Sequence, residues 1–435
     1  MRTLAEWLAL HEAVHPQSID MGLARVGAVA RTLGLTGPQC AVITVAGTNG
    51  KGSVAAHLEA LLAVRGARTG LFTSPHFVRY NERIRVDGVD AEDAALVSAF
   101  ERIEQARGTT TLTFFEYNTL AALLIFRDRG VQVAILEVGL GGRLDATNLV
   151  DADVAVLASV GFDHKEYLGD TLEAIGAEKA GIFRAGRAAV LGSAEMPASV
   201  FSAIAARGAR AIVAGEDFSW LQRGDAWDYR GLEQAFGALP PSALAGTIQY
   251  RNAATAFAAA EAMTLDPAPS AAVQALAPHL AAFDAAAAAS ALRRVRLAGR
   301  FQIVPGEVEW ILDIAHNEPA ARVLAAQLRE RALPAPGGRT LAVIGVLADK
   351  DAAAIAAALA PVIDAWIACA LPGPRGGSAA ALAQRLARDA GTVQLADSVR
   401  AGCELARKRA QPGDRVVVCG SLHTVGPALE WLRIY

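Results

Sequence analysis

The chain has 435 residues, of which 53% are hydrophobic and 20% are charged, so it can bury a substantial core and is longer than one typical domain. Its formal net charge of −3 gives no electrostatic footprint for nucleic acid or for an anionic membrane. No segment has the pattern of a signal peptide or a membrane-spanning helix, so we expect a monomeric cytoplasmic enzyme that acts on small molecules.

Short β-branched runs alternate with longer segments rich in alanine and leucine through the first half of the chain. This alternation predicts a parallel α/β sheet with helical crossovers. The runs that we expect to form strands are 42–45, 69–73, 131–138, 154–159 and 188–191.

The first expected strand leads into the glycine-rich turn GTNGKGS, residues 47–53, and a helical pattern over 54–64 follows. Glycines leave backbone N–H groups free to point at phosphate oxygens, and the positive end of the next helix favours an anion there. The usual P-loop pattern places Ser or Thr directly after the lysine, whereas here Gly52 lies between Lys51 and Ser53. We interpret the segment as a nucleotide-phosphate loop rather than a turn with a solvated lysine.

Polar residues follow three of the other expected strands. Ser74 comes after the second strand, Glu137 lies in the apolar third strand, and Asp163 and His164 follow the fourth. Ligands of open α/β sheets bind at the carboxyl ends of the strands, so a hydroxyl, a carboxylate and an imidazole could hold one divalent ion beside the phosphate loop. Magnesium prefers oxygen ligands, so the histidine makes manganese an alternative identity for the ion. A salt bridge from Glu137 to Arg143 is an equal alternative.

The middle of the chain marks the end of the first domain. Residues 208–241 carry aromatic side chains among polar ones and are interpreted as a small β excursion. Residues 270–298 contain an alanine run, which predicts a helix leading to a domain junction near Ala298. We therefore expect one domain over 1–297 and a second over 298–435.

A second alternating series begins after Arg300 and predicts a separate α/β domain. Its expected strands are 301–304, 308–314, 340–346, 363–370, 392–395 and 415–419. The cysteines have no C-x-x-C spacing, so we expect buried thiols rather than a zinc site or disulfides. They are Cys40, Cys369, Cys403 and Cys419.

In order along the chain, ten motifs resemble those of the folylpolyglutamate synthase/dihydrofolate synthase family of the Mur ligase superfamily. They are AGTNGKGS, TSPH, EVGLGGRLDATN, GFDH, EKAGI, RNAATA, GRFQ, LDIAHN, GVLADKD and GSLHTV. The resemblance covers nearly the whole chain and implies a P-loop-type mononucleotide-binding domain followed by a smaller Rossmann-like α/β domain. Two departures are the absence of a proline before Gly299 and the presence of Glu318 after His316-Asn317.

The resemblance also implies ATP and magnesium, with two ions expected, and a role for several residues. The implied ATP contacts are Thr48, Asn49, Gly50, Lys51, Gly52, Ser53, Asn252, Arg300, Asp313 and His316. Ser74, Glu137 and His164 match magnesium ligands, and Lys179 matches a lysine carried as a carbamate that binds a second ion. From the residues alone, Lys179 reads as half of a surface ion pair with Glu178. Lys51, Lys179, His164 and Glu137 form the implied catalytic set.

Two further segments match the dihydropteroate site of bifunctional bacterial members. They supply Thr113, Phe114 and Glu116, and Leu144, Asp145 and Ala146. Core packing is the alternative for Phe114 and for Phe115.

The implied reaction joins L-glutamate to dihydropteroate or to a reduced folate through an acyl phosphate. The competing interpretations are a Mur ligase acting on a UDP-muramyl acceptor and a non-catalytic ATP-binding switch.

Overall fold

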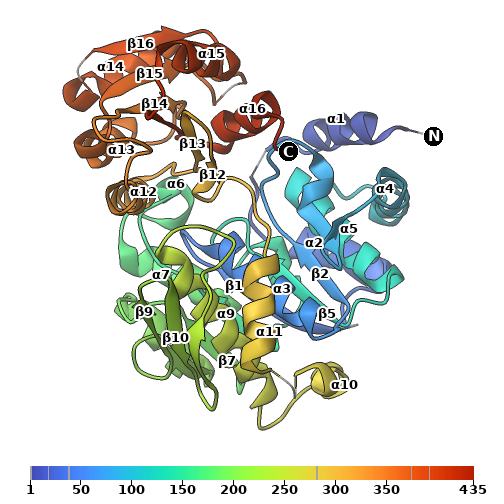
Figure 1. Ribbon diagram of the computed structural model, residues 1–435. Helices are drawn as coiled ribbons and strands as arrows, with labels where there is room; N and C mark the ends of the chain where they lie inside the picture. Colours follow the sequence, from blue (N-terminus) through green and yellow to red (C-terminus); the bar gives the residue numbers. More distant parts are fainter. Residues whose placement is uncertain (1, 18, 38–39, 281–282, 374, 391) are drawn as a thin grey trace. The chain divides into compact units, whose positions relative to one another are not determined.

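The computed structural model describes every residue except 1, 18, 38–39, 281–282, 374 and 391, and for 387–390 it describes only the backbone (Figure 1). The chain divides into two compact units. The N-terminal unit contains residues 1–76, 80–243 and 249–296, and the C-terminal unit contains 77–79, 244–248 and 297–435. The sequence patterns give no sign that the two short segments 77–79 and 244–248 join the second unit.

An eight-stranded sheet of order β4-β3-β2-β5-β1-β6-β7-β8 forms the centre of the N-terminal unit. The strands are β1 (Ala41–Ala46), β2 (Thr69–Phe72), β3 (Ile84–Val86), β4 (Val89–Asp90), β5 (Val133–Glu137), β6 (Val154–Leu157), β7 (Ala188–Leu191) and β8 (Arg210–Val213). The β2–β3 and β3–β4 pairs are antiparallel and the other pairs are parallel. The parallel α/β arrangement is thus confirmed, whereas the β3–β4 hairpin was not predicted.

Helices cover both faces of this sheet (Figure 1). They are α1 (Leu4–Val14), α2 (Ala24–Thr32), α3 (Lys51–Val64), α4 (Asp93–Arg107), α5 (Phe114–Asp128), α6 (Lys165–Leu168), α7 (Leu172–Lys179), α8 (Ala198–Arg207), α9 (Ile248–Thr264), α10 (Ala271–Leu280) and α11 (Ala285–Arg294), with 3-10 turns η1 (Tyr80–Arg83), η2 (Ala146–Leu149) and η3 (Ala180–Ile182). Successive strand side chains point to opposite faces, so Ile43 and Val45 pack toward α3 and α9 while Val42 packs toward α5. Burial on both faces explains why β1 is apolar throughout.

The expected β excursion over 208–241 contains two different structures. Its start forms β8, the edge strand of the large sheet, and the remainder forms an antiparallel sheet of β9 (Ser219–Arg223), β10 (Ala226–Arg230) and β11 (Ala235–Leu239). Trp227 stacks on Phe257 of α9 with the ring centroids 5.9 Å apart. The buried carboxylate of Glu261 accepts hydrogen bonds from the Tyr229 hydroxyl and from two backbone N–H groups. These contacts hold the small sheet on α9.

The single helix expected over 270–298 is wrong, because α10 and α11 meet at an angle of 97°. Residues 281–282 between them lie outside the described part of the chain. Leu276 of α10 and Leu292 of α11 are buried in the core around α3, and α11 lies beside α3 (Figure 1). Within the described residues, no single helix is long and apolar enough to cross a membrane. Among these residues only α10 and α11, taken together as a bent pair, have that length and composition.

A six-stranded sheet of order β12-β13-β17-β14-β15-β16 forms the centre of the C-terminal unit, and only β12 runs antiparallel. The strands are β12 (Gln302–Val304), β13 (Glu309–Leu312), β14 (Thr340–Ile344), β15 (Ala365–Cys369), β16 (Val393–Ala396) and β17 (Arg415–Cys419). The helices are α12 (Glu318–Glu330), α13 (Ala352–Leu359), α14 (Ala379–Ala390), α15 (Val399–Arg409) and α16 (Leu422–Leu432), with the 3-10 turn η4 (Ala360–Val362). All four cysteines of the chain are free and buried, as expected.

Candidate active site

The strand order brings the sequence-predicted loops of the N-terminal unit to one edge of the large sheet. β1, which leads into the phosphate loop, lies between β5 and β6, and β2 lies beside β5. The carboxyl ends of these four strands and the segments that follow them carry Lys51, Ser74, Glu137 and His164. Because the four strands are parallel, their carboxyl ends meet at the same edge, where open α/β sheets bind ligands.

The phosphate loop requires glycine at two positions. Gly50 has φ +89°, and a Cβ there would lie 3.1 Å from Oδ1 of Asn252. Gly47 has φ +151°, and a Cβ there would lie 3.1 Å from the backbone N of Ser159. Side chains are therefore excluded by both backbone conformation and space, so the bare backbone of the loop forms the surface before α3.

The loop is fastened to the segment that follows β6. Ser159 Oγ accepts from the Asn49 N–H at 3.1 Å and donates to the Asn49 carbonyl at 2.9 Å. The Thr48 hydroxyl donates to the carbonyl of Gly161 at 3.0 Å and accepts from its N–H at 2.9 Å. These paired bonds fix the loop before any ligand arrives.

Two lysine amines converge on one carbonyl of the phosphate loop. Nζ of Lys51 donates to the Gly47 carbonyl at 2.9 Å, and Nζ of Lys179 donates to the same oxygen at 3.2 Å. Lys179 is buried, and its pKa is lowered to about 7, first by this burial and second by the positive charge of Lys51. Glu178 instead pairs with Arg143 at 2.8 Å. The surface ion pair read from the sequence is therefore wrong for Lys179.

Glu137 ends β5, and its carboxylate contacts the residues after β2. The Thr73 hydroxyl donates to Oε2 of Glu137, and the Ser74 N–H lies 3.4 Å from the same oxygen. His164 has a φ of +49° at the start of α6, and its Nε2 lies 4.0 Å from Oδ1 of Asp163. Arg143 pairs with Glu178, so the alternative Glu137–Arg143 salt bridge does not form.

The donor set can be tested against a divalent ion. The described residues contain no group of three or more His, Cys, Asp or Glu side chains that could hold a metal. Ser74, Glu137 and His164 supply one hydroxyl, one carboxylate and one imidazole. That set suits a magnesium ion that keeps several waters and also binds substrate phosphates, rather than an ion held in an all-protein cage.

Glu116 and Thr113, two of the expected acceptor residues, form a capping box at the start of α5. The Thr113 hydroxyl accepts from the Glu116 N–H at 3.2 Å, and Oε2 of Glu116 accepts from the Thr113 N–H at 2.7 Å. Oε1 of Glu116 pairs with Arg25 at 3.2 Å. Burial raises the pKa of the Glu116 carboxyl.

Asp145 holds the loop that follows β5. Its Oδ2 accepts from the N–H groups of Gly139 and Leu140, and its Oδ1 accepts from the N–H and hydroxyl of Thr147. Burial raises its pKa. Four protein donors thus engage the carboxylate, which fixes the backbone of the neighbouring Leu144 and Ala146.

The two phenylalanines at the start of α5 differ in their surroundings. Phe115 packs against Phe72 at 5.6 Å, and a Cβ on Gly139 would lie 2.6 Å from its ring. Phe114 is half-buried, with Tyr80 edge-on at 6.0 Å and the Arg83 guanidinium carbon 5.4 Å from its centroid. Both side chains are half-buried and pack against the same core, so core packing accounts for Phe115 and contributes at Phe114, whose ring also lies near the Arg83 guanidinium.

The C-terminal unit brings Arg300, which precedes β12, near Asp313 and His316, which follow β13. Burial raises the pKa of the Asp313 carboxyl and the charge of Arg300 opposes that shift; the carboxylate accepts from the Phe301 and Ala315 N–H groups, both at 2.8 Å. His316 contacts the Ile314 carbonyl at 3.0 Å through Nδ1. Glu318 begins α12, and Asn317 caps this helix through Ala320.

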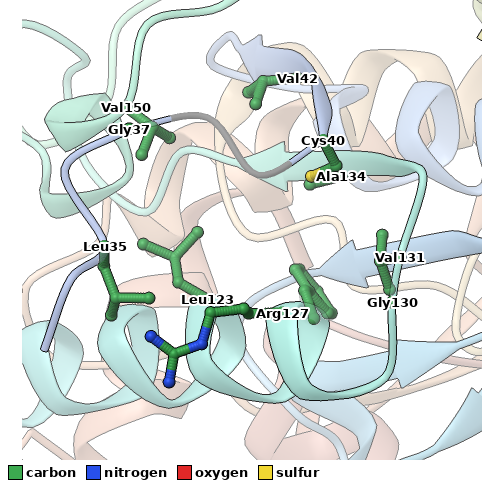
Figure 2. Close-up of a pocket in the computed structure, with 11 residues that line it drawn as sticks. Leu35, Gly37, Cys40, Val42, Leu123, Arg127, Gly130, Val131, Ala134 and Val150 are labelled. Carbon is green, nitrogen blue, oxygen red and sulfur yellow. The ribbon is translucent and has the colours of Figure 1, made fainter. Parts of the chain in front are cut away.

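The pocket in Figure 2 lies elsewhere, at the amino ends of β1 and β5. Leu35, Leu123, Val131 and Ala134 contribute apolar side chains to it, and Arg127 donates to the Leu33 carbonyl at 2.7 Å. None of the expected site residues lines this pocket.

Family models match both parts of the chain: the Mur ligase middle domain over residues 45–260 and the Mur ligase glutamate ligase domain over 299–422. The dihydrofolate synthase/folylpolyglutamate synthase of Escherichia coli (strain K12) is 43% identical over 427 residues, which cover 98% of this chain and 95% of that protein. The Mycobacterium tuberculosis protein of the same name is 32% identical over 94% of this chain and 90% of its own length. This chain belongs to the dihydrofolate synthase/folylpolyglutamate synthase family.

Solved structures of the family extend the likeness to the whole fold. E. coli FolC in complex with DHPP and ADP is 41% identical, with a TM-score of 0.90 over 100% of this chain and 98% of that one. A bifunctional folylpolyglutamate synthase/dihydrofolate synthase with Mn, AMPPNP and L-glutamate bound is 38% identical, with a TM-score of 0.87 over 100% of this chain and 98% of that one. The two-domain α/β architecture expected for the family is confirmed.

Within this family fold, two hydroxyl residues support the site and were missed as site residues from the sequence. Thr73 donates to Glu137, and Ser159 fastens Asn49 of the phosphate loop. Each is the last residue of an expected strand, at the carboxyl edge of the sheet, and this position is the signal that could have identified them. What each hydroxyl contacts depends on which strands are neighbours, and that emerges only from the folded sheet.

Proposed function

We propose that this chain is an ATP-dependent ligase that adds L-glutamate to dihydropteroate, forming dihydrofolate, and to reduced folates, forming folylpolyglutamates. The observation that carries the proposal is the phosphate loop with Lys51 and Lys179 on one carbonyl, set between the loops of Ser74, Glu137 and His164. The relatives bound to ADP, AMPPNP, L-glutamate and DHPP support the same chemistry for a chain this similar.

The reaction would proceed in two balanced steps. A carboxylate oxygen of the acceptor attacks the γ-phosphorus of ATP, and the bond to the β-phosphate oxygen breaks to release ADP. The amine of L-glutamate then attacks the acyl carbon, the C–O bond to phosphate breaks, and the amine loses a proton. The acyl phosphate supplies the leaving group that a free carboxylate lacks.

The ATP phosphates would bind to the backbone of the phosphate loop, at Thr48, Asn49, Gly50, Gly52 and Ser53. The Lys51 ammonium would stabilise the charge on the phosphoryl group during its transfer. We propose Asn252, Arg300, Asp313 and His316 as further ATP contacts. When bound, magnesium or manganese would neutralise phosphate charge, and Ser74, Glu137 and His164 would hold one such ion.

Lys179 is proposed to carry a carbamate that holds a second ion. Its pKa of about 7 leaves a substantial fraction of neutral amine near neutral pH. That nitrogen can attack CO2, forming an N–C bond and releasing a proton, which converts a cationic side chain into an anionic oxygen ligand.

The acceptor is proposed to bind with its flat rings against Phe114, beside Thr113 and Glu116 at the start of α5. The backbone of Leu144, Asp145 and Ala146 would form the other part of that site. The Asp145 carboxylate is occupied by four donors, so we assign it the task of holding this backbone. An enzyme using ATP and folates in this way would work as a cytoplasmic protein.

Product analysis tests the function directly. Purified protein is incubated with ATP, magnesium and L-glutamate, together with dihydropteroate in one reaction and a reduced folate monoglutamate in another. Dihydrofolate in the first and an extended glutamate chain in the second are expected by mass spectrometry. ADP release that depends on neither acceptor nor glutamate would contradict the proposal. Product formed only with a UDP-muramyl acceptor would show instead that the chain is a ligase for that acceptor.

The metal role of Glu137 has a separate test. Glu137→Gln keeps an acceptor for the Thr73 hydroxyl but removes the charge, so binding of Mn²⁺ in the presence of ADP, followed by electron paramagnetic resonance, should weaken by about ten- to a hundredfold. Glu166→Gln, at an exposed position on α6, should leave it unchanged. Full activity together with undiminished metal binding in Glu137→Gln would contradict the assignment.

A further inference from the structure

Arg83, the last residue of η1, is a buried cation that the site described above leaves unused. It is 8% exposed, and burial lowers the pKa of its guanidinium. Taking a charge out of water costs several kcal/mol unless an opposite charge and hydrogen bonds compensate for it. A residue of this kind therefore needs either an ion-pair partner or a ligand.

The described residues do not supply an ion-pair partner for Arg83. Nε of Arg83 donates to Nδ1 of His76 at 2.8 Å, and an accepting Nδ1 belongs to a neutral imidazole. Its guanidinium carbon lies 5.4 Å from the Phe114 ring centroid and 5.8 Å from that of Tyr80. Among the described residues no carboxylate forms an ion pair with it; Tyr80, Glu82 and Glu137 act on its charge only through space.

The other fully buried arginine among the described residues is neutralised. Arg415, with a side chain 2% exposed, pairs with Glu309 at 3.0 Å and donates to three backbone carbonyls. Arg85, on the strand that follows Arg83, pairs with Glu59. The unpaired guanidinium of Arg83 thus contrasts with that of Arg415, although the half-buried Arg251 also forms no ion pair in the described part of the chain.

The position of Arg83 indicates which anion would pair with it. Its carbonyl accepts from the Thr73 N–H at 2.9 Å, and the Thr73 hydroxyl holds the Glu137 carboxylate. On its other side lies the half-buried ring of Phe114. Arg83 therefore stands between the proposed metal ligands and the proposed contact for the acceptor's rings, where the reacting carboxylate has to be held.

We propose that Arg83 binds the carboxylate of the acceptor, the benzoate group of dihydropteroate or the terminal carboxylate of a folate, before that group is phosphorylated. The inference rests on the proposed function and adds a residue that recognises the reacting group. A planar guanidinium presents paired N–H donors that match a carboxylate, and its terminal amino groups make no bond to the described residues. The guanidinium carbon lies 5.4 Å from the Phe114 ring centroid, so a carboxylate bound by Arg83 would lie beside this ring.

The test compares equilibrium binding of dihydropteroate with that of an analogue in which hydrogen replaces the carboxylate, in the absence of ATP. Wild-type protein should prefer the acid by about ten- to a hundredfold, the range expected for hydrogen bonds to a charged group. Arg83→Met should lose this preference while binding the analogue within about twofold of wild type. Arg83→Lys keeps the positive charge but lacks the paired N–H donors of the guanidinium, so it should retain part of the preference for the acid.

Arg85→Met is the matched control, because it removes a neighbouring arginine that already has a protein partner. It should keep the full preference for the acid. An unchanged preference for the acid in Arg83→Met would overturn the proposal. It would also be overturned if folded Arg83→Met and Arg83→Lys lost affinity equally for the acid and for the analogue, because that result indicates a structural role.

The failure of this inference can be told apart from failure of the proposed function. If wild-type protein forms dihydrofolate and Arg83→Met has an unchanged KM for dihydropteroate, only the assignment of Arg83 is wrong. If wild-type protein forms no product with any folate acceptor, the function is wrong. A wild-type protein that also binds the acid no better than its analogue excludes Arg83 as a carboxylate site.

Discussion

Lys179 shows how burial changes the chemistry that a side chain can carry out. On a helix surface its amine would be protonated across the physiological range, but here its pKa is about 7. Desolvation is the first cause and the neighbouring Lys51 is the second. Both depend on the fold, because Lys51 and Lys179 are far apart in sequence and meet only at the Gly47 carbonyl.

The carbamate proposed on Lys179 predicts dependence on CO2 and pH. Only the neutral amine reacts, so activity should fall as pH falls through about 7, and it should fall further in buffers purged of CO2. Carbon-13 bicarbonate should give a carbamate signal by nuclear magnetic resonance that Lys179→Ala lacks. Lys165→Ala removes an exposed lysine and should keep the signal. A Lys179→Ala enzyme with wild-type activity would refute the role.

His11 makes a second prediction at the residue scale. Its ring is 1% exposed, stacks on Tyr117 at 3.8 Å, and has no hydrogen-bond partner at either nitrogen. Its pKa is lowered to about 4, chiefly by burial, from the ordinary value of 6.5 that we take for the unfolded chain. The unfolded state therefore binds the proton first, and stability should fall as pH drops from about 6.5 to about 4.

The size of this loss is about 3 kcal/mol by the linkage between pKa and stability. His11→Phe keeps the ring packing and removes the titration, so its urea unfolding midpoint should change less than that of wild type between pH 7 and pH 4.5. If the urea midpoints of the two proteins changed equally between these pH values, His11 would not contribute to the pH dependence of stability.

At the scale of elements, the start of α5 serves both stability and the proposed acceptor site. Thr113 and Glu116 close a capping box, while Phe114 between them presents a half-buried ring. The hydrogen bonds of the box fix the first turn of the helix, and the first turn carries the ring. Loss of the cap should therefore affect both properties.

Thr113→Ala should lower the free energy of unfolding by about 1 kcal/mol and raise the KM for dihydropteroate, whereas Thr113→Ser should keep both. Thr3 and Glu6 form the same motif on α1, so Thr3→Ala is a matched control. It should lower stability by a similar or smaller amount without changing that KM. Denaturant unfolding and steady-state kinetics check the two quantities, and an unchanged KM in Thr113→Ala would separate the cap from the site.

At the scale of the whole molecule, each unit has a sheet and a buried core of its own. The C-terminal unit also holds an ion network, in which the buried Glu309 pairs with the buried Arg415 and with the exposed Arg331. Neither unit needs a partner chain to cover its sheet edges in order to form its core. We expect a monomer of 45.2 kDa in solution, measured by sedimentation equilibrium, and a native mass of twice that value would contradict it.

The amino-acid sequence by itself determined the elements and the chemistry of the phosphate loop. β-branched runs predict buried strands because alternate side chains face two covered sides, and glycines at 47 and 50 predict a bare backbone because no side chain fits there. The order of motifs identified the family, which the comparisons confirm. The break between α10 and α11 was missed, since alanine favours a helix without fixing where it ends.

Only the tertiary structure decided which of these residues meet. Strand order is set by packing of distant segments, so no local pattern shows that Thr73 holds Glu137 or that Lys51 and Lys179 share a carbonyl. Burial is also a property of the whole fold, and it gives Lys179 its lowered pKa and leaves Arg83 a cation without an ion-pair partner among the described residues. The sequence supplied the groups, and the fold set their charge states and neighbours.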